Sequence, residues 1–158
     1  MDTNDIQALS DRLEIVDVLT RYCTALDSRR WDLLADVFAP DGIAEFGDLG
    51  GRHEGPAAVA EFVRSVLGGL DASQHLLGNQ VVRLDGDRAE ATCYFQAQHL
   101  LVSANGGNTY LVGGTYDDEL VRTPAGWRIS LRRLTPTWYD GNAGVFTEAA
   151  ARLAGEQA

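Results

Sequence analysis

The chain has 158 residues, of which 45% are hydrophobic, the size and composition of one domain with one sizeable core. Its 13 Lys and Arg residues against 23 Asp and Glu residues give a formal net charge of -10, which repels phosphate backbones and excludes nucleic acid as an expected partner. No apolar run approaches the roughly 20 residues of a bilayer span, and the acidic N-terminus lacks a signal-peptide pattern, so we expect a cytoplasmic protein with no membrane partner.

The N-terminal part of the chain has the apolar spacing of helices. Apolar residues recur at three- and four-residue steps and predict one long amphipathic helix that ends near Asp27; they are Ile6, Leu9, Leu13, Val16, Leu19, Cys23 and Leu26. A short helix is predicted over residues 31–38, where Pro40-Asp41-Gly42 stops it, and a short strand over residues 43–46. A third helix is expected to run from Pro56 to the glycines at 68 and 69.

From residue 74 onward the apolar period changes to two. Strands are predicted roughly at 74–84, 88–103, 108–122 and 127–138, and glycine-containing turns join them into an antiparallel meander. Helices ahead of a meander indicate one α+β domain, spanning 1–158, in which the helices cover one face of a curved sheet.

The ends and the thiols add little chemistry. We place the domain core at about residues 6–140. The tail at 141–158 is Ala-rich from residue 148 and is either a short helix or frayed.

Cys23 and Cys93 fall in apolar segments without the pairwise spacing of a zinc site, so the sequence predicts reduced core cysteines and no metal centre.

Two polar residues interrupt apolar rows of the predicted sheet. Alternation places His99 among the apolar residues of its strand, and it places Arg133 on the face that begins with Trp127. An inward guanidinium would need an anionic or carbonyl partner and would suit a pocket lining. A β-bulge before Arg133 would instead turn this residue to solvent, and the alternation alone leaves both alternatives open.

Three residues near the junction of helices and meander are further candidates. Asp27 closes the first helix, Tyr22 lies one turn before it, and His75 opens the first meander strand. Each also has an ordinary structural interpretation, since Asp caps helices, Tyr packs in cores and a His beside leucines is commonly structural.

Four sequence segments together resemble the SnoaL-like branch of the nuclear-transport-factor-2-like (NTF2-like) superfamily over about residues 6–140. They are the run Arg21 to Leu34 with its Leu-Asp-x-x-x-Trp-Asp step, Phe38-Ala39-Pro40-Asp41-Gly42, Gln74-His75, and Gly126-Trp127-Arg128-Ile129. The resemblance implies a cone-shaped barrel and is strongest toward scytalone dehydratase, the bile acid 7α-dehydratases and hexachlorocyclohexane dehydrochlorinase. It therefore implies a lyase that uses no cofactor.

The resemblance also implies roles for individual residues. The Asp-His base dyad of these lyases matches Asp27 and His75, the tyrosine of the bile acid enzymes matches Tyr22, and an arginine of the dehydrochlorinase matches Arg133. The strand aspartate of the bile acid enzymes falls near Gln98 or His99.

The interior of such a cone is expected to be apolar and aromatic, which suits a small polyketide-, terpenoid- or steroid-like ring compound. Candidate substrate-binding residues are Trp31, Phe46, Phe62, Phe95, His99, Trp138 and Tyr139. An isomerase or cyclase on the same scaffold, or a ligand-binding module without catalysis, are the alternatives. We also expect a homodimer through the outer sheet face, where Thr92, Tyr94 and Gln96 lie.

Overall fold

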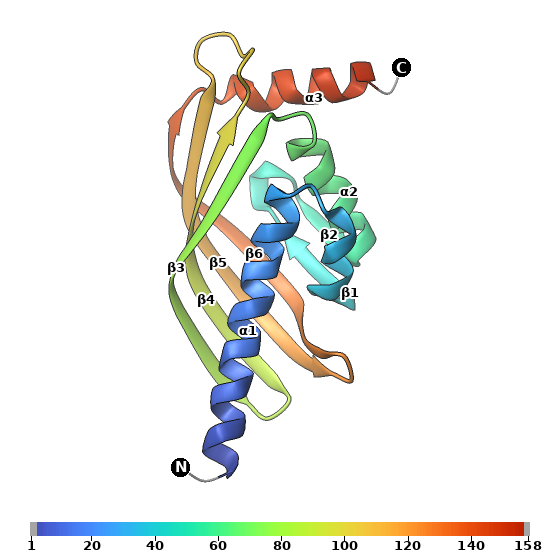
Figure 1. Cartoon of the computed structure of the whole chain (residues 1–158), viewed down its shortest axis with the longest axis vertical. Coiled ribbons are helices and arrows are strands. Elements are labelled where there is room, and N and C mark those ends of the chain that lie inside the picture. Colours follow the sequence, from blue (N-terminus) through green and yellow to red (C-terminus); the bar gives the residue numbers. More distant parts are fainter. Residues whose placement is uncertain (1–2, 157–158) are drawn as a thin grey trace.

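The chain folds into a curved six-stranded sheet against which a long N-terminal helix packs (Figure 1). The computed structural model describes residues 3–156. Its elements in chain order are α1 (Thr3–Asp27), the 3-10 helix η1 (Trp31–Asp36), β1 (Phe38–Glu45), the 3-10 helix η2 (Gly47–Leu49), β2 (Arg52–Glu54), α2 (Pro56–Leu67), β3 (Ala72–Asp85), β4 (Arg88–Leu100), β5 (Thr109–Thr123), β6 (Gly126–Gly141) and α3 (Gly144–Glu156).

The sheet is mixed, whereas the sequence predicted an antiparallel one. The strand order is β2-β1-β6-β5-β4-β3, and β3 to β6 form the predicted antiparallel meander. Strand β1, however, pairs parallel with β6 and begins already at Phe38. Its register shifts between Phe38 and Ile43, so Pro40-Asp41-Gly42 interrupts the ladder within a strand and does not stop a helix there.

Helix α1 packs on the sheet through the C-terminal part of its predicted apolar stripe. Of the predicted stripe, Leu19, Cys23 and Leu26 are buried, and Val18 and Tyr22 are buried beside them. The predicted stripe does not continue toward the N-terminus, because the side chains of Ile6, Leu9 and Leu13 are exposed. The N-terminal part of α1 instead buries the carboxylate of Asp11 against β5 and β6.

Helices α2 and α3 close one end of the domain, at the upper end of Figure 1. Helix α2 begins at Pro56, as predicted, and the chain passes so close to α3 at Gly69 that a Cβ there would lie 1.9 Å from the carbonyl oxygen of Ala149. A side chain larger than hydrogen is excluded at this crossing. The tail is therefore a helix that packs on the core, with Val145 and Ala149 fully buried.

None of the helices within residues 3–156 is both long and apolar enough to cross a membrane.

Candidate active site

A cavity of about 350 Å³ lies between α1, α2, the inner face of the sheet and α3. Most of its wall is aliphatic or aromatic, and the predicted site residues that line it are Tyr22, Phe46, Phe62, His75, Phe95, His99 and Tyr139. A pocket of this size and character suits a small organic ligand. Trp31 and Trp138 do not line it.

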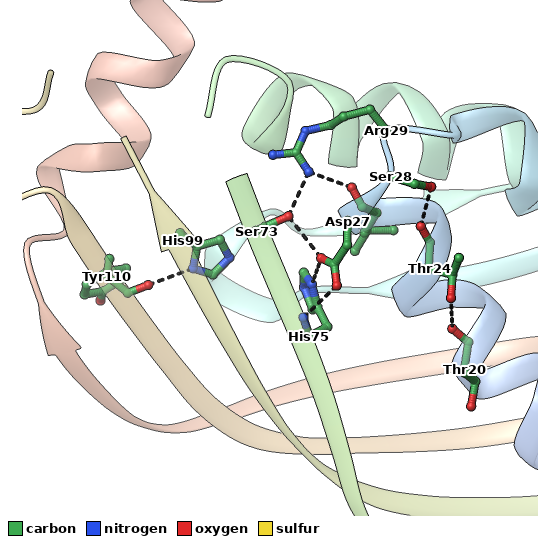
Figure 2. A network of polar contacts seen from close by, with 10 residues as sticks. Thr20, Thr24, Asp27, Ser28, Arg29, Ser73, His75, His99 and Tyr110 are labelled. Atoms are coloured by element: carbon green, nitrogen blue, oxygen red, sulfur yellow. Dashed lines mark hydrogen bonds and ion pairs between the residues drawn. The ribbon is translucent and has the colours of Figure 1, made fainter. Parts of the chain in front are cut away.

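Asp27 and His75 lie at hydrogen-bond distance, as predicted (Figure 2). Asp27 is the last residue of α1, and its Oδ1 is 2.6 Å from His75 Nδ1. The backbone N–H of His75 donates to Asp27 Oδ2 at 2.7 Å, and the Ser73 hydroxyl donates to Oδ1 at 3.0 Å. Because an ionised carboxylate only accepts hydrogen bonds, Nδ1 of His75 carries a proton and Nε2 is left for the cavity.

A second layer of contacts positions Ser73 beside the carboxylate. Arg29, which adopts a left-handed φ of 60°, donates from Nη1 to both the Ser73 hydroxyl and the Leu26 carbonyl oxygen at 2.7 Å. Burial raises the pKa of Asp27, but the hydrogen bonds from His75 and Ser73 outweigh it, so this pKa lies below its ordinary value. Asp27 is therefore an anion at neutral pH. Sequence reasoning missed Ser73 and Arg29, although both flank predicted site residues.

His99 is a second imidazole in the cavity, and it is only 4% exposed. Its ring is perpendicular to that of His75, with centroids 6.0 Å apart, and its Nδ1 lies 2.9 Å from the carbonyl oxygen of Tyr110. Burial lowers the pKa of His99 to about 4. His99 is therefore neutral at physiological pH.

Tyr22 lines the cavity in front of a buried arginine that sequence reasoning missed. The guanidinium of Arg132 lies 4.2 Å from the ring centroids of both Tyr22 and Tyr116. It donates two hydrogen bonds of 2.7 Å to Asp118, directly opposite on β5, and both side chains of this ion pair are fully buried. Desolvation raises the pKa of Tyr22 well above its ordinary value, so the phenol stays protonated and can donate a hydrogen bond.

Arg133 does not face the cavity: of the two alternatives left open by the sequence, the β-bulge is present and the inward orientation is wrong. Glu119 pairs with Leu131 while Leu120 pairs with Ile129, so Ser130 is an extra residue in β6. This β-bulge shifts the alternation by one position and turns Arg132 inward. The Arg133 side chain is 50% exposed and forms ion pairs with Glu45 at 3.0 Å and Glu119 at 3.5 Å.

The two tryptophans predicted as cavity walls lie elsewhere. Trp31 lines a groove between η1 and α2. Trp138 is 41% exposed and covers Gly113, where an added Cβ would lie 2.0 Å from the indole. A register shift between Gly113 and Gly114 accompanies this packing.

Several cavity residues come from segments that sequence reasoning did not assign to a site. Tyr110, Val112 and Tyr116 follow the period of two along β5 and could have been found from that alternation. Phe146 comes from α3, and its ring centroid lies 4.6 Å from that of His99.

The remaining candidate chemistry is limited. Among the described residues, no group of three or more His, Cys, Asp and Glu side chains is arranged to hold a metal ion. Cys23 and Cys93 are both buried and free, and burial raises the pKa of their thiols to about 12 and about 11. These thiols are thus protonated at neutral pH and are weak nucleophiles.

The chain belongs to the SnoaL-like domain family, whose profile matches residues 7–133. A relative, the protein Rv2910c of Mycobacterium tuberculosis, is 37% identical over 129 residues, which cover 80% of this chain and 86% of that protein. The predicted family resemblance is therefore confirmed.

Solved structures show the same fold. The hexachlorocyclohexane dehydrochlorinase LinA-type3 of Novosphingobium barchaimii superposes with a TM-score of 0.77 at 20% identity, covering 89% of this chain and 95% of that one. A protein of Novosphingobium aromaticivorans assigned as a scytalone dehydratase gives 0.76 at 18% identity, with 85% and 89% covered. An NTF2-like superfamily protein of Salmonella enterica gives 0.73 at 20% identity, with 87% and 97% covered. The NTF2-like fold is thus shown.

Proposed function

We propose that this protein is a cofactor-independent lyase of the dehydratase type, acting on a small, largely apolar ring compound of polyketide, terpenoid or steroid character. One observation carries the proposal. His75 is tied through Nδ1 to the Asp27 carboxylate at 2.6 Å and lines an apolar cavity with its other ring nitrogen unbonded by any residue of 3–156.

In the proposed reaction, Nε2 of His75 removes a proton from carbon while Asp27 accepts the Nδ1–H hydrogen bond and stabilises the imidazolium that forms. The electron pair of the C–H bond becomes the new C=C bond as the neighbouring C–O bond breaks. The departing hydroxide recovers the proton from His75, so one water leaves and the protein returns to its starting state.

The departing oxygen needs a hydrogen-bond donor, and Tyr22 fills that role in this proposal. Its phenol is neutral, lines the same cavity and lies against the charge of Arg132. Arg133, 50% exposed and paired with Glu45, has no part in the reaction.

The structural relatives support a lyase, because one is named as a dehydrochlorinase and another is assigned as a dehydratase. An isomerase or cyclase would use the same base without loss of a leaving group. A ligand-binding module would keep the Asp27–His75 pair as a structural contact only.

The test is a mass-spectrometric screen of cyclic β-hydroxy ketones with the wild type, His75→Gln and Asp27→Asn. We expect loss of one water with the wild type and a fall in turnover of about 100-fold or more in both variants, since each removes the positioned base. Asp17→Asn, on an exposed position of the same helix, is the matched control and should keep full activity. A product of unchanged mass would indicate an isomerase or cyclase, and full activity of His75→Gln would exclude His75 as the base.

A further inference from the structure

The hydrogen-bonding state of His99 follows from its partner. The carbonyl oxygen of Tyr110, 2.9 Å from Nδ1, can only accept a hydrogen bond, so Nδ1 carries a hydrogen. A neutral imidazole has one N–H, and the burial of His99 keeps it neutral. Nε2 of His99 is therefore an acceptor that cannot donate.

This acceptor belongs to the cavity wall. Figure 2 shows the ring between Tyr110, which takes one nitrogen, and the strand that carries His75. No residue of 3–156 donates a hydrogen bond to Nε2 of His99, and the neighbouring ring of Phe146 offers no donor. An acceptor without a protein partner in an apolar cavity favours a ligand that brings its own donor.

The two histidines thus face the same cavity with different capacities. His75 is hydrogen-bonded to an anion and is suited to take a proton, whereas His99 is bonded to a neutral carbonyl and is suited only to accept a hydrogen bond. Their ring centroids are 6.0 Å apart, so one small ring compound can contact both.

We propose that His99 is a specificity-determining residue whose Nε2 accepts a hydrogen bond from a hydroxyl group of the substrate that does not take part in the elimination. The substrate is then a compact apolar ring compound with a free alcohol or phenol close to the carbon that meets His75, since the two imidazole rings are 6.0 Å apart. The position of that carbon rests on the proposed function, whereas the recognition of the hydroxyl does not.

The same geometry excludes other groups at this position. A carbonyl or ether oxygen would place a lone pair against the lone pair of Nε2, and an anion would meet a cavity without a free cation in its wall among the described residues. Tyrosine hydroxyls donate as well as accept, so they do not fix which partner the ligand must offer here, whereas Nε2 of His99 can only accept.

The probes are 2-naphthol and its methyl ether, which differ in the hydroxyl donor, and binding is measured by isothermal titration calorimetry. The wild type is expected to bind 2-naphthol about tenfold more tightly than the ether or better. His99→Leu should lose most of this preference, while the acceptor of His75 remains in the cavity. His99→Gln should keep part of the preference, because its amide can donate to the Tyr110 carbonyl and still offer an oxygen to the ligand. Asp17→Asn, on an exposed position of α1 away from the cavity, is the control and should keep the full preference.

A second measurement does not depend on a variant that folds. Nitrogen-15 NMR of histidine-labelled wild type should show His99 with a protonated Nδ1 and an unprotonated Nε2. The opposite tautomer, or equal affinity of the wild type for the two probes, would overturn the proposal. His75→Gln should retain the preference for 2-naphthol, so a failure of the elimination assay and a failure of hydroxyl recognition are separate outcomes.

Discussion

Two aspartates of helix α1 contact the sheet, Asp11 in the N-terminal half and Asp27 at the C-terminal end, and they differ in what surrounds them. Asp11 accepts hydrogen bonds from Arg122 at 2.8 and 2.7 Å, from the Trp127 indole at 3.2 Å and from Gln7 at 3.0 Å. Asp27 accepts from the side chain and backbone of His75 and from Ser73. Both carboxylates are well bonded, so bonding of the carboxylate does not distinguish a site from a structural contact.

The two aspartates differ in the residue that each of them binds. Arg122 also pairs with Asp87 and stacks over Trp127, so its bonding is completed within the protein. His75 keeps a ring nitrogen that no residue of 3–156 uses, at the wall of a cavity. We therefore propose that the Asp11 contacts stabilise the fold and that the Asp27 contacts serve the function, and the following predictions test this difference.

The largest effect on stability is expected at a third carboxylate contact, between Asp118 and Arg132. Arg132→Met should lower the free energy of unfolding by about 3–5 kcal/mol, because it leaves the fully buried Asp118 without a partner. Arg133→Met, one residue further and half exposed, should change it by less than about 1 kcal/mol. Urea denaturation of the two variants measures both, and a larger loss in Arg133→Met would contradict the bulge at Ser130.

As the pH falls, the protein should lose the stability contribution of the buried His99 before it loses that of Asp11 or Asp27. The folded pKa of His99, about 4, lies below its ordinary value of 6.5, so the unfolded state binds more protons in this window and stability falls as the pH drops from 6.5 to 4. The loss is on the order of 2–3 kcal/mol. Asp11 and Asp27, whose folded pKa values lie below 3.8, lose their contribution only as the pH falls further. Denaturation across this pH range should show a flatter profile above pH 4 in His99→Gln, and an unchanged profile would count against a neutral His99.

Replacing Asp11 should cost more stability than replacing Asp27. Asp11→Asn is expected to lower the free energy of unfolding by about 2 kcal/mol, since a buried charge partner of Arg122 is lost, and to leave the chemistry intact. Asp27→Asn should lower it by about 1 kcal/mol or less, because the amide keeps one acceptor for His75 at a partly exposed position. Thermal unfolding and the turnover assay, measured on both variants, test whether Asp11 is structural and Asp27 functional. Equal effects of the two variants on stability and on turnover would contradict this difference.

The smallest expected effect on stability comes from a change in the association of two chains. We propose that the chain forms a homodimer through the outer face of the sheet, where Leu76 and Tyr94 are each 58% exposed on neighbouring strands. Light scattering should give twice the 17.1 kDa of the chain, and Tyr94→Lys should shift the population toward monomer with little change in stability. A monomeric wild type at micromolar concentration would contradict this proposal.

Much of this structure could be predicted from the sequence. Periodicity located α1, α2 and the meander, and the resemblance brought Asp27 and His75 together although 48 positions separate them. These features depend on local patterns and on short motifs, which a single sequence carries.

What escaped prediction depends on tertiary context. A single extra residue at Ser130 exchanges the faces of Arg132 and Arg133, and alternation gives no sign of it. In the N-terminal half of α1, Ile6, Leu9 and Leu13 are exposed and Asp11 is buried, and hydrophobic periodicity does not predict a buried carboxylate. The parallel pairing of β1 was hidden because Pro40-Asp41-Gly42 has the composition of a turn.

The position of α3 has an evolutionary consequence. This helix lies beyond residue 133, where the family match ends, yet it contributes Phe146 to the cavity and is anchored by the Arg152–Asp71 ion pair of 2.7 Å. The proposed base and the part of the wall that α3 supplies are thus encoded in separate stretches of the gene. Changes at the 3′ end of the gene can therefore reshape which molecules fit in the cavity while the Asp27–His75 pair stays untouched.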